Sequence, residues 1–210
     1  YFDANSFSAT GQTVSISASV ADCKSMDWTG VLNAPTFDVS NSLSVYGSFT
    51  LVDNMTLSGG SSISFKSTSA GNTVAFSGHS SARSIYFNGV GGEWDMQDSI
   101  IITSQFKWFK VEEGILNTNG YTIQTGFFHI LGNSTINLSS SDIKILRYFN
   151  LSSPNVNSAT STIYLVSRSS STITHSSQVA LNNLINESIS SGGNILGGNG
   201  SYNKIVQKGD

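Results

Sequence analysis

The sequence contains few of the residues that fix a fold or a chemistry on their own. It has one cysteine, Cys23, so an internal disulfide is excluded, and we expect this thiol to be a small apolar side chain rather than a nucleophile. It has only two prolines, and its 10% aromatic content argues against a disordered serine-rich linker. Nothing in the composition divides the chain, so residues 1–210 are expected to form one unit.

Charge and long apolar runs are also scarce. Only 11% of residues are charged and the net charge is −3, which leaves no basic patch for a run of phosphates and excludes nucleic acid as a partner. No stretch of about 18 apolar residues occurs, so the chain is not expected to span a membrane. Serine makes up about a fifth of the residues, and the surface is therefore expected to be rich in hydroxyl groups.

What the sequence does contain is short runs of alternating apolar and polar residues. Examples are SISFKS from Ser62, TVAFSG from Thr73 and STIYLVS from Ser161, each rich in β-branched and aromatic types. This pattern predicts strands throughout the chain. Only QVALNNLI, Gln178–Ile185, has a weak helical spacing.

The predicted strands resemble one another. LSVYGS at Leu43, ISFKST at Ile63 and SIYFNG at Ser84 recur about 20 residues apart, which is a period typical of solenoid repeats. We therefore predict an all-β fold, a parallel β-helix with coils of about 20 residues. The alternative is a β-sandwich or jelly roll, in which the period is the length of one strand and its turn.

The stretch FNGVGGEWDMQDSI, Phe87–Ile100, gathers acids around an aromatic residue. Strand alternation predicts that Trp94 and Met96 are buried, whereas Glu93 and Asp95 face water. In this interpretation the acids are an ordinary exposed strand face.

The same acids also fit the pattern E-x-D-x-x-[DE]. This resembles the catalytic strand of β-glucanases of the jelly-roll glycoside hydrolases, and the resemblance implies Glu93 as nucleophile, Asp95 as its helper and Asp98 as acid/base. Asp98 stands where that family has a glutamate. A retaining mechanism needs carboxyl groups about 5–5.5 Å apart, so the shorter side chain weakens the case.

Two further segments carry candidate site residues. In FKWF, alternation places Phe106 and Trp108 on one face and Phe109 on the other, so an exposed Phe106/Trp108 pair could contact a sugar or a partner protein. In SSSDIKILR, Asp142, Lys144 and Arg147 resemble the acid-and-cation groove by which pectate-lyase-like β-helices handle uronates. One acid is too few for a calcium site, and a solvated ion pair is the simpler interpretation.

Several phrases resemble segments of large surface proteins of Bacteroidetes. In those proteins, G-x-G-G-x-W-x-L-Q-D and G-x-L-N-T-N-G recur between strands, and the matching segments here are CKSMDWTG (Cys23–Gly30), SLSVYGSFTLV (Ser42–Val52), FNGVGGEWDMQDSI and EGILNTNGYTI (Glu113–Ile123). The resemblance implies a non-enzymatic structural or adhesive segment of a cell-surface protein of the gliding-associated type. It also implies export by the type IX secretion system, with the translocon proteins as partners during export. Asp98-Ser99-Ile100 matches the O-glycosylation signal D-[ST]-[AILVMT] of such exported proteins, which implies a sugar on Ser99.

These observations lead to one functional prediction with one alternative. We predict an extracellular, adhesive β-helix, a segment of a longer surface protein, that contacts surface glycans or a partner protein. The alternative is a carbohydrate-active enzyme, either β-glucanase-like or pectate-lyase-like. No spacing of His and Cys typical of a metal site and no cofactor motif occurs, so neither a metal nor a cofactor is expected.

Overall fold

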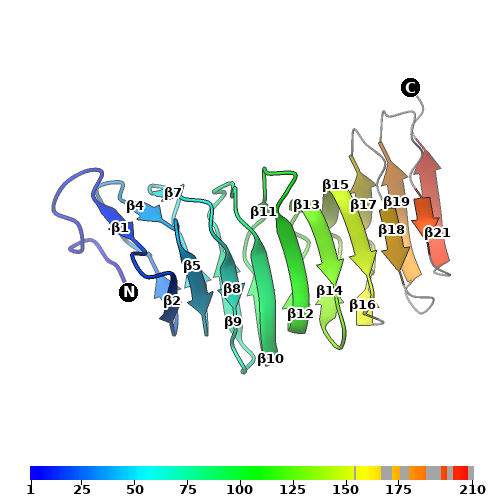
Figure 1. The fold of residues 1–210 in the computed structure, drawn as a ribbon, viewed down its shortest axis with the longest axis horizontal. Helices are drawn as coiled ribbons and strands as arrows, with labels where there is room; N and C mark the ends of the chain where they lie inside the picture. The colour runs from blue at the N-terminus through cyan, green and yellow to red at the C-terminus, as the bar shows by residue number, and fades with distance from the viewer. Residues whose placement is uncertain (154, 167–171, 176–179, 188–194, 198–200, 208–210) are drawn as a thin grey trace.

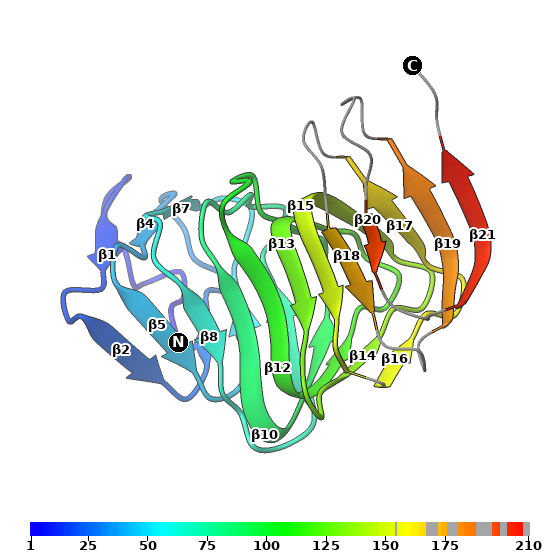
Figure 2. The ribbon, with the colours of Figure 1, turned by 45° about the vertical axis from the view of Figure 1, so that its right-hand side comes forward.

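The chain winds into a parallel β-solenoid of about eight turns, with successive strands about 21 residues apart. The computed structural model describes residues 1–153, 155–166, 172–175, 180–187, 195–197 and 201–207. Figure 1 shows the strands side by side along one long axis, and Figure 2 shows the same stack turned toward its right-hand end. All strand pairings among the described residues are parallel, which confirms the predicted β-helix and excludes the sandwich alternative.

The described strands form three faces, here called the first, second and third sheets. The first sheet contains β2 (Val20–Cys23), β5 (Ser42–Val45), β8 (Ile63–Phe65), β18 (Thr172–His175) and β20 (Ile195–Gly197), with parts of β10 (Ile85–Met96), β12 (Trp108–Asn117), β13 (Ile123–Ile130) and β15 (Asp142–Leu151). The long strands bend around a corner, so each belongs to two sheets.

The other two sheets complete the coil. The second contains β3 (Met26–Asp27), β6 (Phe49–Thr50), β9 (Asn72–Ala75), β14 (Thr135–Asn137) and β16 (Asn155–Asn157), with the ends of β10 and β12. The third is in two parts. One part is a separate three-stranded sheet of β1 (Thr13–Ser15), β4 (Thr36–Asp38) and β7 (Thr56–Ser58). The other contains β11 (Ile100–Ile101), the starts of β13 and β15, β17 (Thr162–Leu165), β19 (Ala180–Asn186) and β21 (Ser201–Gln207).

Inward side chains stack in columns because equivalent residues of successive coils are in register. Phe109, Phe128 and Phe149 form one such column, with ring centroids 5.5 and 5.9 Å apart. Trp94 and Met96 are completely buried, as the alternation predicts. One cluster of buried hydrophobic residues extends through the described coils, and burial of this surface stabilises the stack.

The corner between the two halves of β10 requires glycine. A Cβ on Gly89 would lie 1.9 Å from the carbonyl oxygen of Ser67 in the preceding coil, and one on Gly92 would lie 2.2 Å from the same oxygen. The register of β10 against β12 shifts at this point. The glycines of FNGVGGEW therefore allow two coils to approach closely at a corner.

The weak helical spacing at 178–185 is a strand in the structure. Leu181 and Leu184 are both buried although they are three positions apart, so the inward side of β19 changes between them. Leu181 pairs with Tyr202 and Leu184 with Ile205. This change of inward side produces the same spacing of apolar residues as one helical turn.

Two side chains have environments that the sequence did not predict fully. Arg83 is 1% exposed and donates hydrogen bonds to the carbonyl oxygens of Ser58 and Gly59, at the end of β7. Burial lowers its pKa to about 10.

Cys23 packs against the core but is only partly buried. Burial is the larger cause that raises the pKa of its thiol, and the negative charge of Asp22 is the smaller one.

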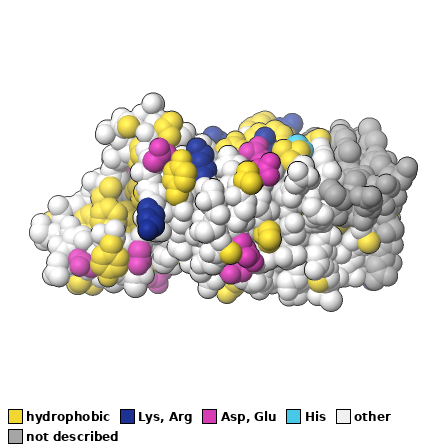
Figure 3. Space-filling model, turned by 90° about the horizontal axis from the view of Figure 1, so that it is seen from below, with side chains coloured by type: hydrophobic (Ala, Val, Ile, Leu, Met, Phe, Trp, Pro, Cys, Tyr) yellow, Lys and Arg dark blue, Asp and Glu magenta, His cyan; other side chains and the backbone are white. Residues whose placement is uncertain are grey.

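The outer surface has few charges. Figure 3 shows mostly backbone and uncharged polar side chains, with acids and bases in small separate groups. Among the described residues, no helix is long and apolar enough to cross a membrane.

Candidate functional site

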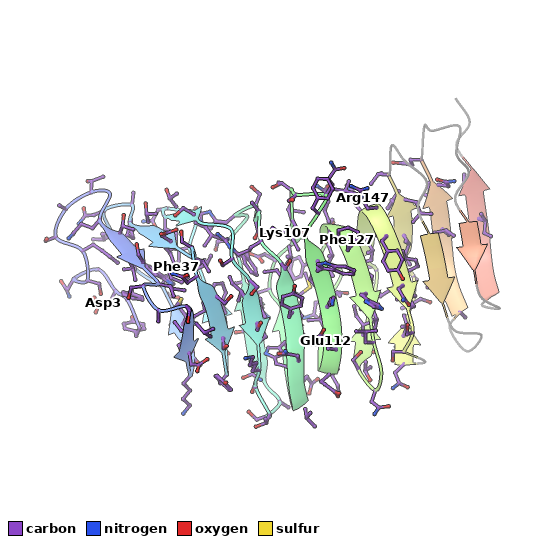
Figure 4. The ribbon with its side chains drawn as sticks, in the orientation of Figure 1. Asp3, Phe37, Lys107, Glu112, Phe127 and Arg147 are labelled. Carbon is purple, nitrogen blue, oxygen red and sulfur yellow. The ribbon has the colours of Figure 1, made fainter. Side chains whose placement is uncertain are left out.

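A strip of outward aromatic residues crosses four consecutive coils of the first sheet. It comprises Tyr86 on β10, Trp108 on β12, Phe127 on β13 and Tyr148 on β15, here called the aromatic strip. All four side chains are partly exposed, and Figure 4 shows Phe127 on the outside of the stack. Soluble proteins seldom gather aromatic residues on an outer face without a use for them.

Strand register aligns three members of the strip, whereas Tyr86 pairs with Lys110 and so lies in the neighbouring column. Trp108 pairs with Phe127, and Phe127 pairs with Tyr148. The rings of Trp108 and Phe127 stack with centroids 4.5 Å apart at 21°. Tyr148 is turned away from this stack, at 55° to Phe127 and 69° to Trp108, so its ring does not continue the parallel stacking.

Local geometry fixes the corner of the chain that directly precedes Phe127 on β13. A Cβ on Gly126 would lie 2.2 Å from the carbonyl oxygen of Gln105, so only glycine fits there. Thr125 is fully buried, and its hydroxyl donates to the carbonyl oxygen of Lys107 at 3.2 Å. The chain is thereby held so that Phe127 faces outward and Phe128 inward.

A second column of polar side chains accompanies the aromatic strip. Tyr86 pairs with Lys110, Lys110 with His129, and His129 with Asn150. The Lys110 ammonium lies 4.5 Å from the Trp108 ring centroid and 5.7 Å from that of Tyr86. Such cation–π contacts hold the charge at the edge of the strip.

Hydrogen-bonding groups lie beside the rings. Asn150 donates to the phenol oxygen of Tyr148 at 3.1 Å and accepts from Ser152 at 2.6 Å. Lys110 also lies 3.7 Å from a carboxylate oxygen of Glu112. The surface therefore combines aromatic area with amide, hydroxyl and ammonium groups, a composition suited to an amphipathic ligand.

His129 has no hydrogen-bond partner for either ring nitrogen, although both are buried beneath neighbouring side chains. Its ring lies 6.0 Å from that of Trp108 and 6.2 Å from that of Tyr148. Burial lowers the pKa of its imidazole, and the charge of Lys110 lowers it further. The neutral form of His129 is therefore favoured in this environment.

Phe106 and Trp108 both lie outside the core, whereas Phe109 is fully buried. Phe106 is 61% exposed in the turn before β12 and contacts Arg147, whose guanidinium carbon lies 4.7 Å from the ring centroid. Trp108 stacks on Phe127 instead. The two residues thus belong to neighbouring parts of one surface, with different contacts.

The acids of EWDMQD are divided between two environments. Glu93 and Asp95 both accept hydrogen bonds from the side-chain amide of Asn117, each at 2.9 Å. Asp98 instead accepts from the backbone N–H of Phe76 at 2.9 Å. Glu93 and Asp95 are therefore brought together, and Asp98 is engaged separately at the next corner.

An asparagine ladder continues from these acids along the second sheet. Asp95, Asn117, Asn137 and Asn157 occupy equivalent positions in successive coils. Asn137 donates to the side-chain oxygen of Asn117 at 2.6 Å, which orients the amide toward the acids. This arrangement satisfies outward polar groups by stacking amides along the axis.

The remaining predicted residues lie on other surfaces. Asp142 and Lys144 are both partly exposed on the part of β15 that belongs to the third sheet, and no ion pair joins them. The Ser99 hydroxyl accepts a hydrogen bond from the backbone N–H of Thr122 at 3.1 Å. Within the described part of the chain, no group of His, Cys, Asp and Glu is arranged to hold a metal ion.

The sequence interpretation missed most of the aromatic strip. It singled out Trp108 but not Tyr86, Phe127 or Tyr148, because single aromatic residues within strands are usually core residues. A signal was present, since these residues recur at about the coil length in outward positions. Lys110 and His129, which lie beside these rings, belong to no sequence motif that would have singled them out.

Comparison of the chain with models of protein families, with curated proteins and with solved structures finds no match. The resemblance to Bacteroidetes surface proteins therefore stays a prediction based on short phrases.

Proposed function

We propose that this chain is a non-enzymatic adhesive segment of a cell-surface protein and that its aromatic strip binds glycans. The observation that carries the proposal is the row of three outward aromatic residues in register on consecutive coils, Trp108, Phe127 and Tyr148. Tyr86, Lys110 and Asn150 lie in the neighbouring column beside this row. Sugar rings have apolar C–H faces and hydroxyl edges, and this surface offers aromatic area beside hydrogen-bonding groups. A rigid solenoid holds these groups in place before binding, which reduces the entropy lost on association.

The extracellular location and export by the type IX system rest on the resemblance in short phrases. A surface with hydroxyl and amide groups and few charges is compatible with that setting. In this proposal the solenoid acts as a spacer that presents the aromatic strip, and Ser99 is a glycan attachment point.

The contacts of the acids support a non-enzymatic role over the glucanase alternative. Glu93 and Asp95 share the amide of Asn117, and Asp98 accepts from a backbone N–H at another corner. A retaining glycosidase needs two carboxyl groups directed at one bond. The three acids here are occupied by the hydrogen bonds of the coil itself.

The test is glycan binding by the purified chain. We expect retardation in affinity electrophoresis on at least one gel from a panel containing β-glucans, xylan, polygalacturonate and dextran sulfate. Trp108→Ala is expected to weaken binding about tenfold or more, which corresponds to about 1.4 kcal/mol. Glu93→Gln, a substitution on the second sheet, is expected to leave binding unchanged.

A reducing-end assay on the same polysaccharides separates adhesion from catalysis. We expect no release of reducing ends by the wild-type chain. Turnover by the wild type that is lost in Glu93→Gln would instead establish the glucanase alternative, and loss in Asp142→Asn would establish the lyase alternative.

A further inference from the structure

Arg147 is a cation whose donors have no protein partner among the residues that the structure describes. Its guanidinium lies over the exposed ring of Phe106, and among the described residues it has neither a hydrogen bond nor an ion pair. A guanidinium group carries five N–H donors in a planar arrangement that matches a carboxylate or a sulfate. The contact with Phe106 restrains this group at the surface while its donors remain available.

The position of Arg147 connects it to the aromatic strip. Arg147 directly precedes Tyr148 on β15, and Phe106 lies two residues before Trp108. Lys107 directly precedes Trp108 as Arg147 precedes Tyr148, and Figure 4 shows Arg147 toward the upper edge of the stack, above Phe127. A ligand lying on the strip would therefore reach the guanidinium.

Charge is distributed unevenly around the strip. Lys107 lies at the same edge, where its ammonium donates to the carbonyl oxygen of Gly60 at 3.0 Å. Lys110 lies in the column beside the aromatic row, and Glu112, its ion-pair partner, lies nearer the lower edge. The upper edge is thus locally positive although the whole chain has a net charge of −3.

The net charge does not oppose an anionic ligand at this edge. The Debye length at physiological salt is about 8 Å, so distant acids are largely screened, whereas a group in contact with Arg147 is not. A neutral glycan would leave the donors of Arg147 unused. The local chemistry favours an oxyanion.

We propose that the glycan bound by the aromatic strip carries carboxylate or sulfate groups and that Arg147 binds the oxyanion. This inference rests on the proposed function, because it assumes that the strip is a glycan-binding surface. The sugar rings contact Trp108 and Tyr148, and the oxyanion accepts two parallel hydrogen bonds from the guanidinium.

The experiment compares matched charged and neutral polysaccharides by isothermal titration calorimetry with the full chain. Polygalacturonate is paired with its fully methyl-esterified form to test carboxylates, and dextran sulfate is paired with dextran to test sulfates. We expect the charged member of at least one pair to bind about tenfold or more tightly than its neutral partner. Arg147→Gln should remove that preference.

Two further variants test the geometry of the contact. Arg147→Lys keeps the charge without the planar donors and is expected to recover only part of the preference. Lys144→Gln removes the same charge from the same strand on the third sheet and is expected to have no effect. Unchanged thermal midpoints will show that the variants are folded.

The outcomes distinguish this inference from the proposed function. If Trp108→Ala weakens binding to both members of a pair and Arg147→Gln affects neither, the strip binds glycans and the role of Arg147 is wrong. Equal losses in Arg147→Gln and Lys144→Gln would indicate non-specific attraction and would also overturn it. If none of the four polysaccharides binds but a β-glucan or xylan retards the chain in affinity electrophoresis, this inference fails and the proposed function stands. If no polysaccharide of either set binds, both proposals fail, and a protein partner becomes the occupant to seek.

Discussion

At the residue scale, close approach of the coils makes Gly89 the most demanding position of the corner in β10. We predict that Gly89→Ala destabilises the protein by about 1–3 kcal/mol, because the added methyl group would overlap the carbonyl oxygen of Ser67. Gly60→Ala is the matched control, since the nearest atom to its Cβ is 4.0 Å away, and its effect should be within about 0.5 kcal/mol. Denaturant unfolding measures both. Equal effects of the two substitutions would show that the corner relaxes.

The same scale shows which residues the sequence could not place. Arg83 is buried because its guanidinium donates, to the carbonyl oxygens of Ser58 and Gly59, hydrogen bonds that a neighbouring strand would otherwise supply. No pattern within a strand predicts this, because the acceptors lie in the preceding coil. By contrast, the burial of Trp94 and Met96 follows from alternation along one strand and was predicted correctly.

At the scale of one element, β13 presents adjacent phenylalanines to opposite sides. We predict that Phe128→Ala, which removes a ring from the inner column, costs about 3–5 kcal/mol, because it leaves a cavity between Phe109 and Phe149. Phe127→Ala removes a partly exposed ring and should cost only about 0.5–1.5 kcal/mol, the value of its stacking on Trp108. Chemical denaturation gives the two free energies. Comparable losses would mean that the outer ring is a structural part of the coil.

Glycan binding by these two variants should show the opposite order. Phe127→Ala is expected to weaken binding, whereas Phe128→Ala should retain it at temperatures where the variant is folded.

Elements were easier to predict than their mutual register. Alternation located the strands, and the recurrence of similar strands gave the coil length. The exterior contacts depend on how many residues each corner inserts, and this number varies: Phe49 pairs with Val74, twenty-five residues later, but Trp108 with Phe127, only nineteen later. Without those lengths, Trp108, Phe127 and Tyr148 could not be aligned, so the strip was missed.

At the scale of the whole molecule, the binding surface exists only through stacking. Each coil contributes one aromatic residue to the strip, and no single strand contains the site. Strands of neighbouring coils lie about 4.8 Å apart, so the four coils place the aromatic residues over about 14 Å of the long axis. A surface of this length is suited to an extended chain rather than to a single small molecule.

A solenoid also predicts that damage stays local. Each coil contacts only its neighbours, so stability is approximately a sum over coils and their interfaces. We predict that Gly89→Ala lowers hydrogen-exchange protection of amides in β8, β10 and β12, which meet at that corner, more than in β2 or β17. Exchange measured by mass spectrometry at peptide level tests this, with Gly60→Ala as the control. A uniform loss of protection across all described strands would show that the coils unfold as one cooperative unit, and the aromatic strip would then depend on every coil rather than on the four that form it.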